Sequence, residues 1–187
     1  MVEIFSTLPS LIINTFIDKH EVSSQIAVTC YRHSTLELAT FLKLSSLFAY
    51  NNVIDAFVVD SLENEFRYTV VYLLQSTIFN TGVRVYIKTK DGLALFSWQG
   101  IYPGFNWVER EMWDLSGIFF IKHPDLRRIL TDYGFSGHPL RKDFPISGFK
   151  EAHYADSIKQ IRYANVELAQ SFRLAHISPI WFDAQTF

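Results

Sequence analysis

Residues 66–90, FRYTVVYLLQSTIFNTGVRVYIKTK, decide the fold that the sequence predicts. The first ten of them are rich in β-branched and aromatic side chains, which favour a strand. From Val83 to Ile87 every second residue is aliphatic, as in a strand with one buried face. Asn80-Thr81-Gly82 lies between the two runs and is typical of a hairpin connection. The stretch therefore predicts two paired antiparallel strands, over residues 66–75 and 82–90.

More strands and two main helices are predicted on either side of this pair. Residues 52–60, NVIDAFVVD, are apolar and β-branched, which is typical of an inner strand. Ser34 is followed three residues later by Glu37, the pattern of a capping box at the start of a helix. In the second helix, Asn106 is the expected N-cap and Gly117 the expected stop. The expected strands cover about 25–33, 52–60, 66–75, 82–90 and 93–98, with further short strands at 117–121 and 158–168; the expected helices cover 34–49 and about 107–116, with a short one inside 8–20.

This order of elements predicts an α+β fold: a mostly antiparallel sheet packed by helices on one side. The character of the sequence changes at Pro103-Gly104, and from His123 onward the chain is rich in proline and glycine, which favour turns. We therefore expect a globular α+β domain over residues 1–122. An extended, irregular C-terminal arm over residues 123–187 is expected to follow it.

Composition and charge exclude several kinds of protein. The net charge is −2, with 17 basic and 19 acidic residues, so the basic excess of a typical nucleic-acid-binding protein is absent. Cys30 is the single cysteine, which excludes internal disulfides and a zinc or iron–sulfur site held by this chain's cysteines. No apolar run approaches the roughly 20 residues that cross a bilayer. No positive charge precedes Lys19, so neither a secretory signal nor a mitochondrial presequence is recognised; a mitochondrial protein of this sequence would be expected to be made inside the mitochondrion.

Residues 109–143 hold six basic and six acidic residues, and these charges cancel. Balanced charges of this kind suit ion pairs and contacts between subunits better than an anionic ligand. An enzyme of the hydrolase or metal type would have to use His123 and His138, but their spacing matches no usual ligand pattern, and no Gly-x-Ser-x-Gly motif is present. A third hypothesis is an anion-binding module. Its basic residues would be Arg127, Arg128, Arg141 and Lys142.

The same region carries a family resemblance. Residues 106–148, NWVEREMWDLSGIFFIKHPDLRRILTDYGFSGHPLRKDFPISG, resemble the signature of the thirty-kilodalton subunit family of respiratory complex I. This family is also known as NADH dehydrogenase subunit 9 or, in bacteria, the C subunit. Phe66-Arg67-Tyr68 and Ser178-Pro179-Ile180-Trp181 also resemble the family, so the similarity covers most of the chain.

The resemblance implies a structural subunit of the proton-pumping NADH:ubiquinone oxidoreductase, in the peripheral arm next to the quinone module. It places the chain on the matrix side of the mitochondrial inner membrane, or on the equivalent face of a bacterial cytoplasmic membrane. Its implied partners are the hydrogenase-like large subunit and small iron–sulfur subunits, without nucleic acid. The chain itself is expected to hold no cofactor, metal or catalytic residue, while FMN and iron–sulfur clusters belong to other subunits. The expected interface residues are Glu109, Arg110, Glu111, Asp114, His123, Asp125, Arg127, Arg128, Asp132, Tyr133, His138, Arg141, Lys142 and Asp143.

Overall fold

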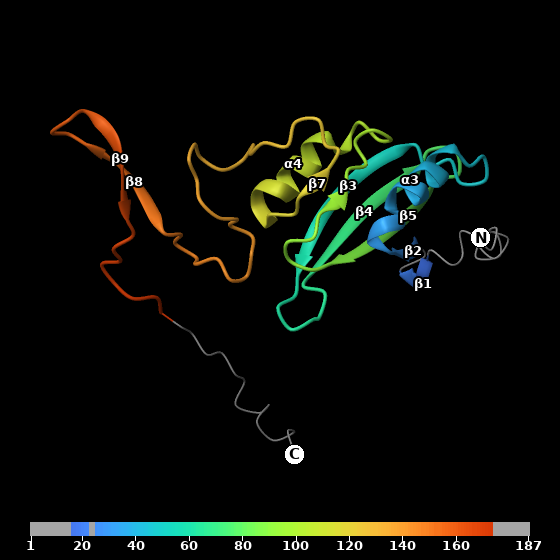
Figure 1. The fold of residues 1–187 in the computed structure, drawn as a ribbon, viewed down its shortest axis with the longest axis horizontal. Helices are drawn as coiled ribbons and strands as arrows, with labels where there is room; N and C mark the ends of the chain where they lie inside the picture. The colour runs from blue at the N-terminus through green and yellow to red at the C-terminus, as the bar shows by residue number, and fades with distance from the viewer. Residues whose placement is uncertain (1–15, 23–24, 174–187) are drawn as a thin grey trace, which may run out of the picture. The chain divides into compact units, whose positions relative to one another are not determined.

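The computed structural model describes residues 16–22 and 25–173 (Figure 1). The described chain forms two compact units, which meet in sequence between Pro145 and Ile146. The sequence placed this boundary between residues 122 and 123. Residues 123–145, called the strap below, lie in the first unit, where they bond to helix α4 (Phe105–Ser116).

The first unit is built on a five-stranded mixed sheet with the strand order β1-β2-β5-β4-β3. The α+β class is confirmed, but the sheet is not wholly antiparallel, because β2 and β5 run parallel. Parallel strands need a long crossover, and the chain provides one by passing through α3 (Thr35–Leu44), β3 and β4 between them. Composition predicts strands but not this order. The strands are β1 (Phe16–Val22), β2 (Gln25–Cys30), β3 (Asn52–Asp60), β4 (Tyr68–Ser76) and β5 (Thr81–Thr89).

The predicted hairpin is confirmed as β4 and β5, which pair antiparallel from Tyr68 opposite Thr89 to Ser76 opposite Thr81. The prediction that β3 is an inner strand was wrong. Within the described chain β3 lies at an edge of the sheet, and its outward side chains are exposed, Ile54 by 54%, for example. The helix expected within residues 8–20 also fails where it can be compared, since residues 16–20 belong to β1; residues 8–15 lie outside the described chain.

Helix α3 (Thr35–Leu44) is shorter than the predicted helix over 34–49. One 3-10 turn, η1 (Arg32–Ser34), precedes it, so the predicted strand over 25–33 ends at Cys30. Ser34 makes no side-chain cap, because it closes this turn and lacks the extended backbone of an N-cap residue. The helix ends where Ser45 becomes extended, at ψ 123°.

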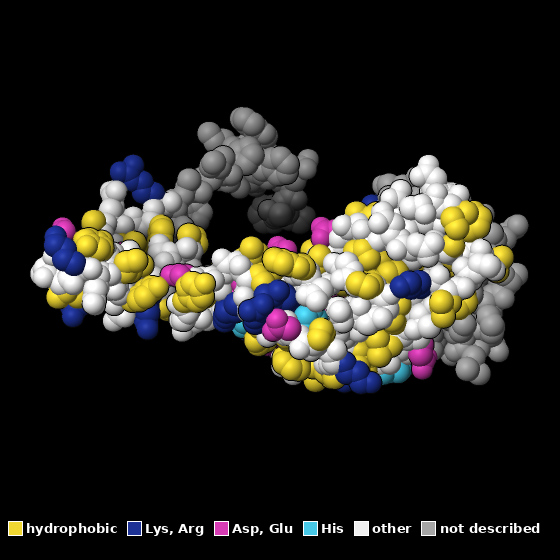
Figure 2. All heavy atoms as spheres, turned by 90° about the horizontal axis from the view of Figure 1, so that it is seen from above, with side chains coloured by type: hydrophobic (Ala, Val, Ile, Leu, Met, Phe, Trp, Pro, Cys, Tyr) yellow, Lys and Arg dark blue, Asp and Glu magenta, His cyan; other side chains and the backbone are white. Residues whose placement is uncertain are grey.

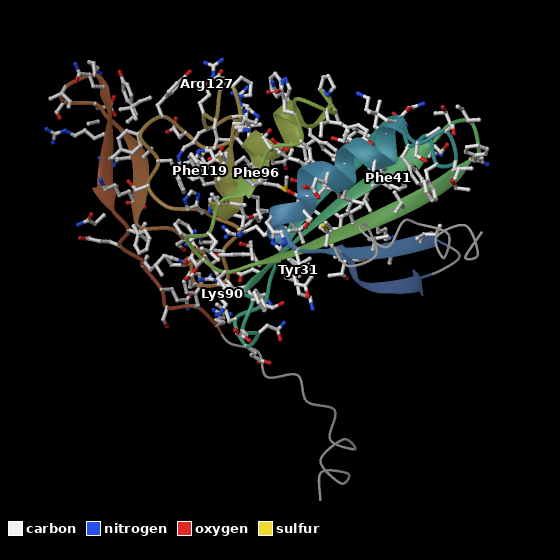
Figure 3. The ribbon with its side chains drawn as sticks, turned by 45° about the vertical axis from the view of Figure 1, so that its right-hand side comes forward. Tyr31, Phe41, Lys90, Phe96, Phe119 and Arg127 are labelled. Atoms are coloured by element: carbon white, nitrogen blue, oxygen red, sulfur yellow. The ribbon has the colours of Figure 1, made fainter. Side chains whose placement is uncertain are left out.

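Helix α4 (Phe105–Ser116) and two short strands complete the first unit. Gly117 ends α4 with φ 79°, as predicted, whereas the N-cap is Gly104 instead of Asn106. The predicted strands over 93–98 and 117–121 shrink to β6 (Leu95–Phe96) and β7 (Phe120–Ile121), which pair in parallel. Figures 1 and 3 show α3 and α4 on the same face of the sheet, as the sequence predicted.

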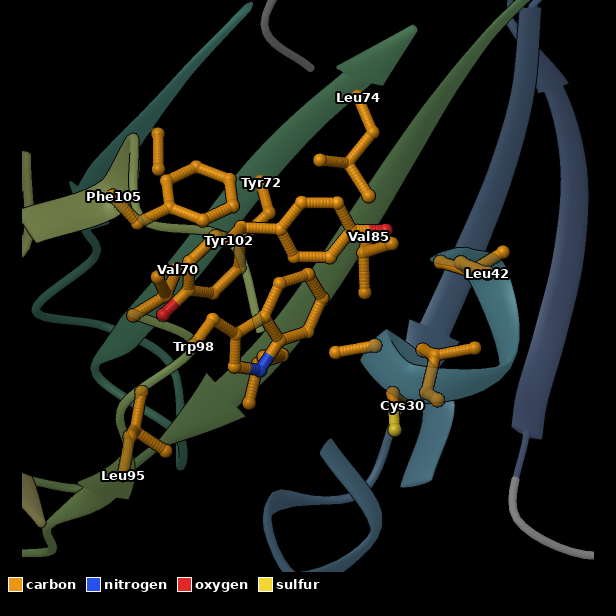
Figure 4. Close-up of a cluster of buried hydrophobic side chains, with 14 of the residues drawn as sticks. Cys30, Leu42, Val70, Tyr72, Leu74, Val85, Leu95, Trp98, Tyr102 and Phe105 are labelled. Atoms are coloured by element: carbon orange, nitrogen blue, oxygen red, sulfur yellow. The ribbon is translucent and has the colours of Figure 1, made fainter. Parts of the chain in front are cut away.

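The core between this face and the helices combines aromatic and aliphatic side chains (Figure 4). The rings of Tyr72 and Trp98 stack at 4.1 Å, and Phe105 meets Tyr72 edge-on at 5.0 Å. Leu42 from α3 and Val85 from β5 belong to the same buried cluster. Part of the high aromatic content therefore serves this chain's own core.

The second unit contains an antiparallel hairpin of β8 (Lys150–Ala155) and β9 (Gln160–Asn165). The predicted strand over 158–168 corresponds to β9, while β8 was not predicted. Tyr154 lies opposite Ile161, and Ala152 opposite Tyr163, so these four side chains share one face of the hairpin. All of them except Ala152 are large and apolar or aromatic, and all three large ones are more than half exposed.

Candidate interface around helix α4

Asp114 is the centre of the contacts between α4 and the strap. Its Oδ2 atom accepts hydrogen bonds from three consecutive backbone N–H groups, those of Ile129, Leu130 and Thr131, at 3.1, 2.8 and 3.0 Å. Its Oδ1 atom accepts from the Thr131 hydroxyl at 2.6 Å and from Arg128 Nη1 at 3.0 Å. Burial alone would raise the pKa of Asp114, but the hydrogen bonds outweigh it and lower the pKa to about 2. The carboxylate therefore stays charged and fixes the strap.

The strap also binds the free carbonyl groups at the C-terminal end of α4. The last carbonyls of a helix have no partner within the helix and need one elsewhere. His138 Nδ1 donates to the carbonyl of Asp114 at 2.9 Å, and the N–H of Leu140 donates to that of Leu115 at 2.9 Å. Arg141 Nε donates to the carbonyl of Ser116 at 2.9 Å. The strap thus caps the helix.

A second charge cluster fastens the end of the strap to the sheet. Arg67 holds both oxygens of Asp60 at 2.9 Å and also binds Asp143 at 2.9 and 3.0 Å. These hydrogen bonds lower the pKa of Asp60 and of Asp143. Arg141 binds Asp91 at 3.2 and 3.3 Å, so the turn after β5 joins the cluster. The residues come from four places in the sequence, and together they close the strap onto the sheet.

Glu109 lies on α4 with its side chain fully buried. One carboxylate oxygen accepts a hydrogen bond from the N–H of Trp98 at 2.7 Å, and the other accepts from the hydroxyl of Ser97. His123 Nε2 is 3.9 Å from the second oxygen, beyond hydrogen-bond distance. Burial raises the pKa of Glu109 to about 7, although the bonds from Ser97 and Trp98 act in the opposite direction.

The other residues of the charged motif are mostly at the surface. Arg110 is buried and its Nε donates to the carbonyl of Arg127 at 3.2 Å. The side chain of Arg127 is 71% exposed and pairs with that of Asp125 at 2.9 Å; Figure 3 shows Arg127 at the outer edge of the unit. Tyr133 is 96% exposed. Glu111, Asp132 and Lys142 are exposed as well. The predicted site residues therefore separate into two groups. The first holds the strap or α4 in place through hydrogen bonds and ion pairs, and its members are called fasteners below. The second consists of the exposed residues just named and is called the surface group.

The two histidines that an independent enzyme would need do not share a site. His123 Nε2 contacts the carbonyl of Asn106 at 3.3 Å, whereas His138 binds that of Asp114. These carbonyls are eight residues apart, or about 12 Å along the helix. In the described part of the chain, no three His, Cys, Asp or Glu side chains come together in a way that would hold a metal ion. None of the helices in residues 16–22 and 25–173 is long and apolar enough to span a bilayer.

Comparison with known proteins decides the family. Residues 28–150 match the profile of the family described as "Respiratory-chain NADH dehydrogenase, 30 Kd subunit". The chain belongs to this family. Within the 30-kilodalton subunit family, one C subunit of the NADH-quinone oxidoreductase of Rhizobium etli is 46% identical over 149 residues, which are 80% of this chain and 74% of that protein. The C subunit of the same enzyme in Paramagnetospirillum magneticum is 40% identical over 91% of this chain and 84% of its own length.

A solved structure shares the fold of this 30-kilodalton subunit family member. It is titled "Structure of the membrane-bound sulfane sulfur reductase (MBS), an archaeal respiratory membrane complex". One of its chains superposes with a TM-score of 0.64 at 20% identity, covering 78% of this chain and 83% of that one. At this identity the match supports the fold alone.

Several fasteners are absent from the predicted site residues and were missed by sequence reasoning. Ser97 and Thr131 supply hydroxyl donors to the buried carboxylates, and Asp60, Arg67 and Asp91 form the cluster at the sheet. Arg67 itself belongs to a stretch that resembles the family, Phe66-Arg67-Tyr68, but nothing in the sequence predicts its contacts with Asp60 and Asp143. A hydroxyl among many serines and threonines gives no signal at all.

Proposed function

We propose that this chain is a structural subunit of respiratory complex I, the proton-pumping NADH:ubiquinone oxidoreductase, and binds neighbouring subunits through the surface around α4. The relatives, which are named as C subunits of NADH-quinone oxidoreductase, support the assembly. One structural observation carries the interface: large apolar side chains remain exposed beside the surface group of the charged motif. Trp107 is 67% exposed, Leu140 63%, Leu130 60% and Phe119 51%.

Such a surface suits a protein partner. Exposed apolar side chains grouped with polar ones mark interaction sites, and Trp, Tyr and Arg contribute most often to their affinity. Tyr133 and Arg127 are both largely exposed near these apolar residues in sequence. Figure 2 shows yellow apolar side chains next to dark-blue, magenta and cyan ones on the visible face of the first unit.

The buried fasteners give this surface a fixed shape. Asp114 and Arg67 hold the strap at two points, so its backbone needs little further ordering on binding. Binding to an ordered surface loses less conformational entropy than binding to a flexible one. In this proposal the buried residues of the charged motif hold the surface in a fixed shape, and its exposed residues contact the partner.

The hairpin of the second unit supports a wider contact. A two-stranded hairpin is marginally stable alone, and its face of Tyr154, Ile161 and Tyr163 is exposed in this chain. We propose that residues 123–187 contact the hydrogenase-like large subunit and small iron–sulfur subunits beside the quinone module. In this proposal the chain holds no cofactor and is not catalytic in isolation. It is peripheral, on the matrix side of the mitochondrial inner membrane or the cytoplasmic face of a bacterial membrane, which cell fractionation of the source organism tests.

The experiment replaces exposed side chains and leaves the fasteners intact. Arg127→Ala and Tyr133→Ala are introduced into the full chain in its own cells, with the exposed Glu63→Ala as the control. We expect the amount of assembled complex and its NADH-driven quinone reduction to fall together for the first two. The thermal unfolding midpoint of each purified chain should stay unchanged. Full assembly with reduced turnover would instead show a direct catalytic contribution, and wild-type assembly and turnover would refute the interface.

A further inference from the structure

We propose that Glu109 and His123 form a buried site that holds one exchangeable proton, and that loss of this proton loosens the start of the strap. Both side chains are fully buried, and their closest polar atoms are 3.9 Å apart. Glu109 lies on α4 and His123 is the first residue of the strap, so the two buried side chains pack at the contact between these segments. This inference concerns the chain's own fold, so it holds or fails independently of the proposed contacts with other subunits.

The donor set of Glu109 is poor for a buried carboxylate. Its hydrogen-bond donors are a hydroxyl and one backbone N–H, both neutral. Asp114 on the same helix is equally buried, but it receives five hydrogen bonds, one of them from Arg128. A buried carboxylate needs charge pairing or several donors to remain ionised. Glu109 has neither, so a proton is the simplest way to neutralise it.

The contacts of His123 assign a hydrogen-bonding role to each nitrogen of its ring. The N–H of Asp125 approaches Nδ1 at 3.2 Å, so Nδ1 accepts and the ring proton lies on Nε2. Nε2 faces the carbonyl of Asn106 at 3.3 Å. Nδ1 is therefore occupied as an acceptor, and the ring of His123 closes the site beside Glu109.

The other ionisable groups near the pair do not neutralise the charge of an ionised Glu109. Tyr72 of β4 faces Glu109; burial, and then the charge of Glu109, raise the pKa of Tyr72 well above its usual value, so it stays neutral. The ammonium of Lys122 lies over the ring of Phe96 at 6.0 Å. The exposed Asp125 carboxylate pairs with Arg127, and the buried guanidinium of Arg110 donates to a backbone carbonyl.

The sign of the effect follows from proton linkage. The pKa of Glu109 is about 7 in the folded chain and 4.5 as a free side chain. The closed structure therefore binds the proton more tightly than an opened one, and raising the pH through this range favours opening. With these two values, opening becomes about tenfold more frequent between about pH 6 and about pH 8.5.

Hydrogen exchange of the full chain measures this opening. After correction for intrinsic rates, protection of peptides spanning residues 118–131 should fall about tenfold between pH 6 and pH 8.5. Glu109→Gln, which stays neutral, should remove the pH dependence. Glu111→Gln, an exposed carboxylate on the same helix, should retain it. Equal pH dependence in wild type and Glu109→Gln, or none in wild type, would overturn the proposal.

An infrared titration tests the proton itself and does not depend on a destabilised variant. In wild type the protonated-carboxyl band should disappear with a midpoint near pH 7. Ser97→Ala removes a donor that favours the ionised form, so the midpoint should move upward. A midpoint in the ordinary carboxyl range, near 4.5, would exclude Glu109 as the holder of the proton.

Discussion

Asp114→Asn is expected to destabilise the first unit strongly while leaving the shape of the side chain nearly unchanged. The substitution removes the charge that Arg128 and three backbone N–H groups bind. It also turns an amide NH2 group toward one of these sets of donors. Breaking a buried ion pair typically costs roughly 3–5 kcal/mol. Because 28% of the Arg128 side chain is exposed to water, we expect about 3 kcal/mol, the low end of that range.

The pH dependence of this loss gives a second, independent number. The pKa of Asp114 falls from 3.8 to about 2 on folding, and each unit corresponds to about 1.4 kcal/mol. A depressed pKa stabilises the fold above 3.8, and this contribution disappears as the pH falls through 2. About 2.5 kcal/mol of the difference between wild type and Asp114→Asn should therefore vanish in strong acid.

Urea unfolding followed by tryptophan fluorescence measures both numbers. Trp98, Trp107 and Trp113 all lie in the first unit, so they report on the part of the chain that contains Asp114. Glu111→Gln is the control and should change the unfolding free energy by less than about 0.5 kcal/mol. The reasoning is refuted if Asp114→Asn matches this control at pH 7, or if its deficit is the same at pH 7 and pH 2.

Three other substitutions test separate parts of the fold by the same unfolding assay. Gly117→Ala should lose at least about 1–2 kcal/mol, because φ is 79° and the new methyl group would lie 2.6 Å from strap atoms; a neutral result would contradict this geometry. Arg67→Lys should lose roughly 1.5–3 kcal/mol, since an ammonium cannot reproduce the forked bonds to Asp60, and a wild-type value would show that the fork is not needed. Leu42→Ala should cost about 2–5 kcal/mol, whereas Leu44→Ala, 76% exposed two residues later, should cost little; equal losses would place the core elsewhere.

Local patterns predicted the elements better than their arrangement. The hairpin of β4 and β5, the bounds of β3 and the stop at Gly117 follow from alternation, β-branched residues and a left-handed glycine. The parallel pairing of β2 and β5 does not, because it depends on which strands meet after a crossover. β8 was missed because KEAHYA contains no β-branched residue and, among Phe, Trp and Tyr, only one tyrosine.

In the candidate site, too, local sequence predicted which residues are present better than how they are arranged. Its sequence identified the family, but not which of the predicted charged residues are buried. Glu109 and Asp114 look alike in sequence, as does the exposed Glu111 between them. Their environments differ because the strap binds Asp114 while Ser97 and Trp98 bind Glu109, and the periodicity of the helix itself describes neither contact. Burial of these carboxylates is therefore a property of the tertiary structure.

The two fastenings of the strap also imply an order of events during folding. Asp114 binds Thr131, 17 residues away, whereas Arg67 binds Asp143, 76 residues away. By the usual logarithmic dependence on loop length, closing the shorter loop costs about 1.3 kcal/mol less chain entropy. Fastening at Asp114 should thus come first and shorten the search for Arg67. We expect the contact that forms last to open first, so unfolding of the strap should begin at the Arg67 cluster.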